Sequence, residues 1–429
     1  MLGVSRLLNG TVTPGDPLRY GRLTSEGPSH LLHYSQDKKP IVVWNLTRRC
    51  NLYCAHCYAD ATDKPQSGEM TTAEGKRLID DLADFGVPVL LFSGGEPLLR
   101  EDLFDLAAYA VAKGIRCVLS TNGTLVTPEV AKRIKEAGLS YVGVSLDGVG
   151  ATHDKIRGKK GAFEQALQGI RYCQDAGIAV GLRFTVHAMN VDEVPGIFDL
   201  AEEEGIPRLC VYHLAYAGRG DKMRRFDLEP HQTRAVVDYI FQRSQDLHAR
   251  GIEKDILTVD NHADNVYLYM RMQKEHPQRA EEVHRMLRWN GGNQSGIAVS
   301  SIDPLGHLHV DQFSWHHSLG DVRQRPFAEI WSDTSDPVMR VLKDRKPHLK
   351  GRCRVCKWLD VCNGNLRVRA ERHFGDFLAP DPACYLTDEE IGVAPGTPAA
   401  EEAARWPAPV QEESTGPSQL SPAPRRRLR

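Results

Sequence analysis

Six short apolar runs, each separated from the next by a helical pattern, limit what residues 41–216 can form. Near-continuous apolar runs of this length are typical of strands buried on both faces, as in a parallel sheet. The runs are IVVWNL (41–46), VPVLLF (87–92), IRCVLS (115–120), YVGVSL (141–146), VGLRFTV (180–186) and LCVYHL (209–214). The pattern predicts an α/β fold with ligands at the carboxyl ends of the strands. Because six strand–helix units are too few to close an eight-stranded barrel, we expect an open partial barrel.

The remaining sequence divides around this core. Helices are predicted over 230–250 and around 275–289, and a hairpin is predicted over 296–313. From residue 391 the chain is rich in Pro, which is typical of disorder. The predicted segments are an N-terminal extension (1–39), the barrel core (40–225), a helical connecting and substrate region (226–295), a small cysteine-bearing domain (296–390) and a disordered tail (391–429).

The ten cysteines are the second constraint, and their meaning depends on the compartment. The formal net charge of −2 gives no overall field for nucleic acid or an anionic membrane. No leader is visible, and no apolar run approaches the ~18 residues of a membrane span. We therefore expect a cytoplasmic protein without nucleic-acid or membrane partners, whose clustered thiols bind metal more often than they form disulfides. Three isolated cysteines are read as packing residues, namely Cys117, Cys173 and Cys210.

The first cysteine group directly follows the first predicted strand, in TRRCNLYCAHCY (47–58). Thiolates from Cys50, Cys54 and Cys57 can hold three irons of a [4Fe–4S] cluster, and the fourth iron is then open to another ligand. A zinc site completed by a distant ligand such as His56 is the alternative.

The second group lies in a loop-rich segment near the end of the fourth predicted segment. It consists of Cys353, Cys356, Cys362 and Cys384. By spacing alone, zinc and an iron–sulfur cluster fit these four ligands equally well.

The first group and the segments after it resemble the radical S-adenosylmethionine (radical SAM) enzymes. The matching pieces occur in order: SGGEP (93–97), STNGT (120–124), SLDG (145–148) and HDKIRG (153–158). The resemblance implies an enzyme whose cluster binds SAM and yields a 5′-deoxyadenosyl radical that abstracts hydrogen. It implies that Glu96 holds the amino group, that Ser145 and Asp147 contact ribose and carboxylate, and that Arg157 lies near the methionine carboxylate. The implied cofactor contacts are Ser93, Gly94, Gly95, Glu96, Asn122, Ser145, Asp147, Arg157 and Arg183.

The second cysteine group resembles the C-terminal auxiliary-cluster domain called SPASM or twitch. The resemblance implies that the four cysteines hold an auxiliary [4Fe–4S] cluster, which makes two clusters in all. The implied fold is a partial (βα)6 radical SAM barrel with a small C-terminal SPASM/twitch-like iron–sulfur domain. Peptide-modifying relatives typically carry about seven cysteines there, which argues against a peptide substrate.

Between the two groups, the chain resembles the NirJ family of radical SAM proteins from haem d1 biosynthesis. The likeness lies in YHLAYAGRGDK (212–222), LTVDNHADNVYLY (257–269), WNGGNQSGIAVSSID (289–303) and GHLHVDQFSWHHSLGDVRQRPFAEIW (306–331). It implies removal of propionates from 12,18-didecarboxysirohaem, with a reducing partner such as ferredoxin or flavodoxin. The alternatives are a related enzyme that decarboxylates iron-coproporphyrin propionates to make haem b, and a peptide-modifying twitch-domain maturase.

A tetrapyrrole with several carboxylates needs cationic partners, and Arg pairs bidentately with carboxylates. Histidines could contact the same carboxylates or the iron. Taken singly, each such residue is more often a solvated or hydrogen-bonded side chain. The substrate candidates are Arg219, Lys222, Arg224, Arg225, His262, His309, His316 and His317.

Overall fold

The computed structural model describes residues 1–21 and 38–406, and its centre is an open, mostly parallel sheet. In sheet order the strands are β1 (Leu2–Gly3), β8 (Asp255–Val259), β7 (Arg208–His213), β6 (Val180–Val186), β5 (Val142–Ser145), β4 (Arg116–Thr121), β3 (Val89–Ser93), β2 (Ile41–Asn45), β9 (Val299–Ile302), β10 (His307–His309) and β11 (Gly320–Asp321). The six predicted strands are β2 to β7, and the predicted open α/β architecture is confirmed. The strands from β8 to β9 run parallel, so their carboxyl ends lie at one edge.

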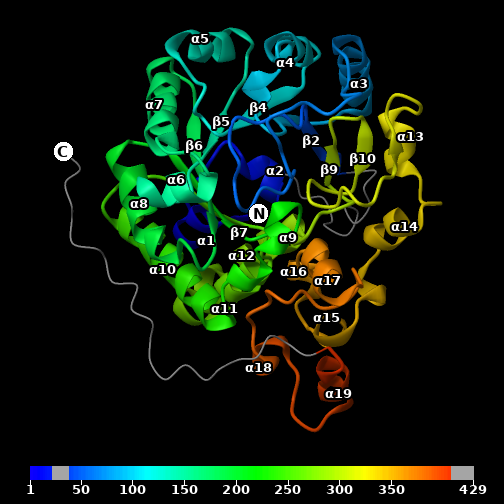
Figure 1. Ribbon diagram of the computed structural model, residues 1–429. Helices are drawn as coiled ribbons and strands as arrows, with labels where there is room; N and C mark the ends of the chain where they lie inside the picture. Colours follow the sequence, from blue (N-terminus) through cyan, green and yellow to red (C-terminus); the bar gives the residue numbers. More distant parts are fainter. Residues whose placement is uncertain (22–37, 407–429) are drawn as a thin grey trace.

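Helices cover the outer face of the sheet, with α3, α4, α5 and α7 side by side in Figure 1. The helices of the outer face are α3 (Thr72–Phe85), α4 (Leu103–Ala112), α5 (Pro128–Glu136), α6 (Ala151–Arg157), α7 (Ala162–Asp175), α8 (Val194–Glu203) and α10 (Pro230–Ala249). A capping box of Thr71 and Glu74 begins α3, which ends at a left-handed Gly86. Its buried face carries Leu78 and Leu82. None of the helices that the structure describes has the length and apolarity to cross a membrane.

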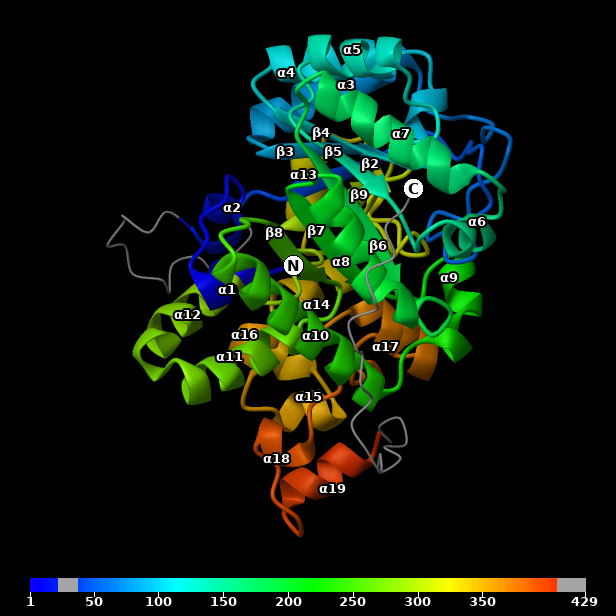
Figure 2. The same ribbon diagram turned by 90° about the vertical axis from the view of Figure 1, so that its left-hand side faces the viewer.

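An additional parallel strand and a structured N-terminus extend the predicted core. β8 pairs with β7 and was not predicted, while β1 pairs antiparallel with β8. Residues 1–21, expected only as an extension, also form α1 (Val4–Asn9) and α2 (Asp16–Tyr20), which lie near β8 in Figure 2. Arg19 and Arg208 both pair with Asp255 at the start of β8, at 2.9 and 2.7 Å. These ion pairs fix the N-terminal segment beneath the barrel.

The C-terminal half is continuous with the sheet. The predicted hairpin forms β9 and β10, but β9 pairs with β2, so the sheet crosses the expected domain boundary at residue 296. The remaining helices are α9 (Arg219–Lys222), α11 (Ala263–Glu275), α12 (Pro277–Asn290), α13 (Phe327–Ser332), α14 (Pro337–Lys343), α15 (Gly351–Val355), α16 (Leu359–Cys362), α17 (Arg367–Phe374), α18 (Asp388–Ile391) and α19 (Pro398–Ala404). In Figures 1 and 2, α18 and α19 lie at the end farthest from α3 to α5. The expected disordered tail is therefore ordered as far as residue 406, and residues 407–429 lie outside the described residues.

A buried ion pair joins the cysteine-bearing helices to the barrel. Arg369 of α17 lies 2.9 Å from Asp381, and both side chains are fully buried. Its guanidinium also donates to the carbonyl oxygens of Leu214 (3.0 Å) and Asp260 (2.6 Å), which follow β7 and β8. One side chain thus holds α17, the loop before Cys384 and two strand ends together.

We predict that Arg369→Met lowers the free energy of unfolding by about 3–5 kcal/mol, because it leaves the Asp381 carboxylate buried and unpaired. Chemical unfolding followed by circular dichroism measures this loss. Arg325→Met is the control, since Arg325 and Asp333 form a partly exposed pair whose loss costs at most about 1 kcal/mol. Equal losses in the two variants would contradict the prediction.

Candidate functional site

A cavity of about 1180 Å³ opens at the carboxyl ends of the parallel strands. The three cysteines of the first group line it, together with most of the expected cofactor contacts. Those that line it are Ser93, Gly94, Gly95, Asn122, Ser145, Arg157 and Arg183. Glu96 and Asp147 are fully buried and do not line the cavity.

The cysteine loop presents three free thiols to this cavity. Each sulfur accepts at least one N–H. Cys50 accepts from the backbone two residues on (3.4 Å) and from Asn122 Nδ2 (3.9 Å), Cys54 from Arg157 Nη1 (3.5 Å) and Cys57 from the backbone four residues on (3.4 Å). Such bonds stabilise cluster thiolates and tune their potential. Burial raises the pKa of Cys50 to about 12, so this thiol stays protonated until a metal displaces its proton. The residues fit an iron–sulfur cluster with one open iron.

Two glycines let the SGGEP segment pack directly on the cysteine loop. The backbone N–H of Gly95 donates to Thr47 O (2.7 Å), and that of Glu96 donates to Arg49 O (2.8 Å). A Cβ on Gly95 would lie only 2.2 Å from Arg49 O, and Gly94 has a φ of 142°. Any side chain at these positions would push the two loops apart.

Glu96 is buried beside the cavity and supports its wall, and its expected contact with an amino group stays a prediction. Its carboxylate accepts from Thr121 Oγ1 (2.8 Å), Asn122 N (2.8 Å) and Leu98 N (3.1 Å). Burial raises the pKa of Glu96 to about 7. The end of β4 and the turn after it thus supply two of the donors that hold the carboxylate.

Asp147 likewise lies behind the wall, where it anchors Arg157, and its expected contact with the cofactor stays a prediction. Its Oδ2 lies 2.6 Å from Arg157 Nη2 and 3.3 Å from His56 Nε2, and its Oδ1 accepts from Thr185 N (3.0 Å). Burial opposes ionisation of Asp147, but Arg157 and His56 outweigh it and hold its pKa at about 2. Asp147 therefore fixes a guanidinium that reaches both the cavity and the sulfur of Cys54.

Among the substrate candidates, only Arg219 lines the cavity. It donates from Nε to Cys54 O (2.7 Å) and from Nη1 to Ala61 O (2.7 Å), and it lies over the ring of Tyr53. These contacts hold the cysteine loop. The others lie outside the cavity: Lys222, Arg224 and Arg225 are exposed, His262 and His309 are buried elsewhere, and His316 and His317 contact Glu371.

The adjacent imidazoles of His316 and His317 share one carboxylate on α17. Each Nε2 lies 2.7 Å from an oxygen of Glu371. Burial opposes ionisation of Glu371, but the two histidines lower its pKa to about 2. The three ligand atoms lie within 4.8 Å of one another and could hold a metal ion. In the metal-free form they join the segment after β10 to α17.

Several cavity residues were not predicted. Tyr58, Tyr212, Thr185 and Asp260 line it. The Tyr58 hydroxyl donates to Asn45 Oδ1 (2.9 Å). Tyr212 and Thr185 lie on predicted strands, so alternation along each strand could have placed them inside. Asp260 follows β8, and that strand was itself missed.

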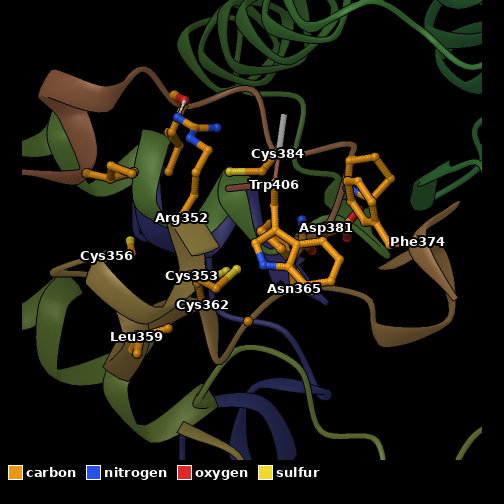
Figure 3. A pocket seen from close by; sticks show the side chains of 15 residues that line it. Arg352, Cys353, Cys356, Leu359, Cys362, Asn365, Phe374, Asp381, Cys384 and Trp406 are labelled. Carbon is orange, nitrogen blue, oxygen red and sulfur yellow. Dashed lines mark hydrogen bonds between the residues drawn. The ribbon is translucent and has the colours of Figure 1, made fainter. Parts of the chain in front are cut away.

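The second cysteine group lines a separate cavity of about 590 Å³ (Figure 3). Cys353 and Cys362 belong to α15 and α16, and Cys356 and Cys384 come from loops. Trp406 lines this cavity and packs edge-to-face on Phe374, with ring centroids 5.2 Å apart; the indole lies between Phe374 and the sulfurs of Cys353 and Cys362 in the figure. Arg352 and Asp381 also line this cavity. Four thiols in an enclosed pocket fit a metal centre with a complete set of protein ligands.

Comparisons with known proteins agree with this geometry. Residues 44–201 match the family described as the Radical SAM superfamily. Fe-coproporphyrin III synthase of Methanosarcina barkeri is 59% identical over 91% of this chain and 99% of that protein. Pre-heme d1 synthase of Dinoroseobacter shibae is 45% identical over 83% of this chain and 88% of that protein.

A solved structure shares the fold. Streptococcus suis SuiB bound to precursor peptide SuiA has a TM-score of 0.65 over 82% of this chain and 77% of that chain. Its sequence identity is 16%, so the likeness concerns the fold alone. The expected barrel with a SPASM-type C-terminal domain is confirmed.

We predict that Glu96 makes the stability of the metal-free protein fall with rising pH. Its folded-state pKa of about 7 exceeds the ordinary 4.5, so its contribution is complete below pH 4.5 and is lost as pH rises through 7. The loss amounts to about 3 kcal/mol. Chemical unfolding of the wild type and Glu96→Gln at pH 5 and pH 8 tests this, because the variant lacks the carboxyl. The control is Glu101→Gln, an exposed change on the same loop, which should keep the wild-type pH dependence of stability. If Glu96→Gln also keeps that pH dependence, Glu96 is not its cause.

Proposed function

We propose that this chain, which belongs to the radical SAM superfamily, converts an iron tetrapyrrole into Fe-coproporphyrin III. The observation that carries the proposal is the 59% identity with Fe-coproporphyrin III synthase over 99% of that protein. This identity extends over nearly the whole length of that relative. We propose 12,18-didecarboxysirohaem as the substrate, whose propionates this reaction would retain.

The three thiols of the cysteine loop would hold the cluster, and the adjacent cavity would hold SAM. When bound, the reduced cluster and SAM supply a 5′-deoxyadenosyl radical that takes a hydrogen atom from an unactivated C–H bond. The chain contributes positioning and exclusion of water. Gly94 and Gly95 allow close backbone approach, and Arg157 offers its guanidinium to the cofactor carboxylate while Asp147 holds it in place.

The four cysteines of the second cavity would hold an auxiliary [4Fe–4S] cluster. Support comes from the pocket that the four cysteines line together with Trp406, Phe374 and Arg352. A low-polarity shell and nearby cations both tune a cluster's potential. We place the reaction in the cytoplasm, where thiols stay reduced, with a reducing partner such as ferredoxin or flavodoxin.

Removal of propionates towards haem d1 is the second candidate. The 45% identity with pre-heme d1 synthase supports it, as do the motifs between the two cysteine groups. The two candidates share the cofactors and differ in which side chains leave the tetrapyrrole, so product mass separates them.

We predict that anaerobic incubation with SAM, dithionite and 12,18-didecarboxysirohaem yields 5′-deoxyadenosine and Fe-coproporphyrin III with all propionates retained. Mass spectrometry of the extracted tetrapyrrole measures this outcome. Cys54→Ala should give neither product, because the cluster loses a ligand. A tetrapyrrole that has lost two propionates would refute the proposal in favour of the haem d1 route, and turnover of a peptide alone would refute both.

We predict about eight irons per wild-type chain and about four in Cys353→Ala, because the auxiliary cluster loses a ligand while the SAM-binding cluster remains. Iron and sulfide analysis of anaerobically purified protein gives the numbers. Cys117→Ala is the matched control, since Cys117 is buried in the β4 core and its removal should leave the iron content unchanged. Stoichiometric zinc in the wild type would contradict the auxiliary cluster.

A further inference from the structure

Arg183 is a cation inside the barrel that has no acidic partner. It lies on β6 and lines the large cavity, and its Nη1 donates to Ser120 Oγ (2.6 Å). Its Nε is buried without a hydrogen-bond partner, and no carboxylate of the described residues lies within ion-pair distance. Its electrostatic neighbours are the neutral side chains of Tyr212, Tyr141 and Tyr58. Arg183 is half-buried and lines the cavity, so its positive charge is placed to meet an anionic ligand there.

The other arginines of the cavity are already neutralised. Arg157 pairs with Asp147 at 2.6 Å, and Arg219 pairs with Asp60 at 3.2 Å. Asp260, which also lines the cavity, follows β8 and forms no ion pair with Arg183. Arg183 is therefore the cavity arginine whose charge is left for a ligand.

The backbone of β5 makes room for this guanidinium. A Cβ on Gly143 would lie 2.3 Å from Arg183 Nε and 2.7 Å from its Cζ, so only glycine permits the observed position. Gly143 pairs in register with Ser120, while Arg183 pairs with Ser145, two residues further along β5. The side chain thus runs back along the barrel, away from the strand ends.

This direction separates Arg183 from the cysteine loop. Arg157 contacts the sulfur of Cys54 and is the cation placed for a cofactor carboxylate. Arg183 lies at the inner end of the same cavity, beside Tyr212 and Ser120. Because Arg157 is placed for the cofactor carboxylate, the charge of Arg183 is left for a second anion.

We infer that Arg183 binds a side-chain carboxylate of the tetrapyrrole, which orients the ring in the barrel. The inference rests on the proposed function, because it requires a substrate that carries carboxylates. A guanidinium forms strong charge-assisted hydrogen bonds with a carboxylate, and Arg183 lines the cavity in which the substrate would lie. Arg183 is thereby proposed as a specificity-determining residue, in place of the cofactor contact that the resemblance implied.

The test measures binding of Fe-coproporphyrin III and of its methyl ester to the cluster-loaded protein by the shift of the tetrapyrrole absorbance. We expect Arg183→Met to weaken binding of the acid at least about 30-fold, the usual effect of removing one partner from a buried charge pair. Binding of the ester, and of radiolabelled SAM by equilibrium dialysis, should be unchanged. Gly143→Ala, which displaces the guanidinium but keeps its charge, should also weaken binding of the acid.

Arg116→Met is the matched control, because Arg116 begins the neighbouring strand β4 and does not line the cavity. Its affinity for the acid should equal that of the wild type. Equal losses for acid and ester in Arg183→Met, or a loss for SAM alone, would overturn the inference and leave the proposed function standing. A wild type that binds neither tetrapyrrole would overturn both. Wild-type iron content and melting temperature in each variant show that it is folded.

Discussion

Parallel hydrogen bonding from β8 to β9 is the constraint on which the rest of the molecule depends. Because these strands share one direction, their carboxyl ends lie at one edge, and the loops that follow them meet there. The cysteine loop follows β2, the paired glycines follow β3, and Asn122 follows β4. The same edge receives Arg369 from α17, which bonds the carbonyl groups after β7 and β8. The register of one sheet therefore positions the first cysteine group. It also positions the strand ends to which the segment with the second cysteine group is attached.

Long apolar runs made most strands of the barrel predictable from the sequence. Short strands and strands flanked by charged residues could not be predicted in this way. β2 to β7 each contain enough consecutive apolar residues to be recognised. β8 has only a short run between Lys254 and Asp260, and its identity as a strand depends on tertiary contacts such as the pairs of Asp255 with Arg19 and Arg208. The Pro-rich composition also predicted disorder for the segment that contains Trp406. That segment is ordered because it packs on a pocket.

The cysteines and their spacing predicted the two places where thiols gather. They did not predict which partners the buried polar groups bond. Glu96 and Asp147 occur in motifs that point to the cavity, yet their carboxylates bond the turns behind it. A sequence motif does not show which of two nearby partners satisfies a carboxylate. The sequence also did not show the partner of two histidines that were predicted to contact the substrate. His316 and His317 contact Glu371, which lies on a helix distant in the sequence.

Trp406 covers a pocket whose four thiols all precede it in the chain. A chain that emerges from the ribosome N-terminus first has completed the set of sulfurs before the residue that encloses them. Removal of the chain beyond α19 would therefore leave all four thiols in place and take away one wall of their pocket.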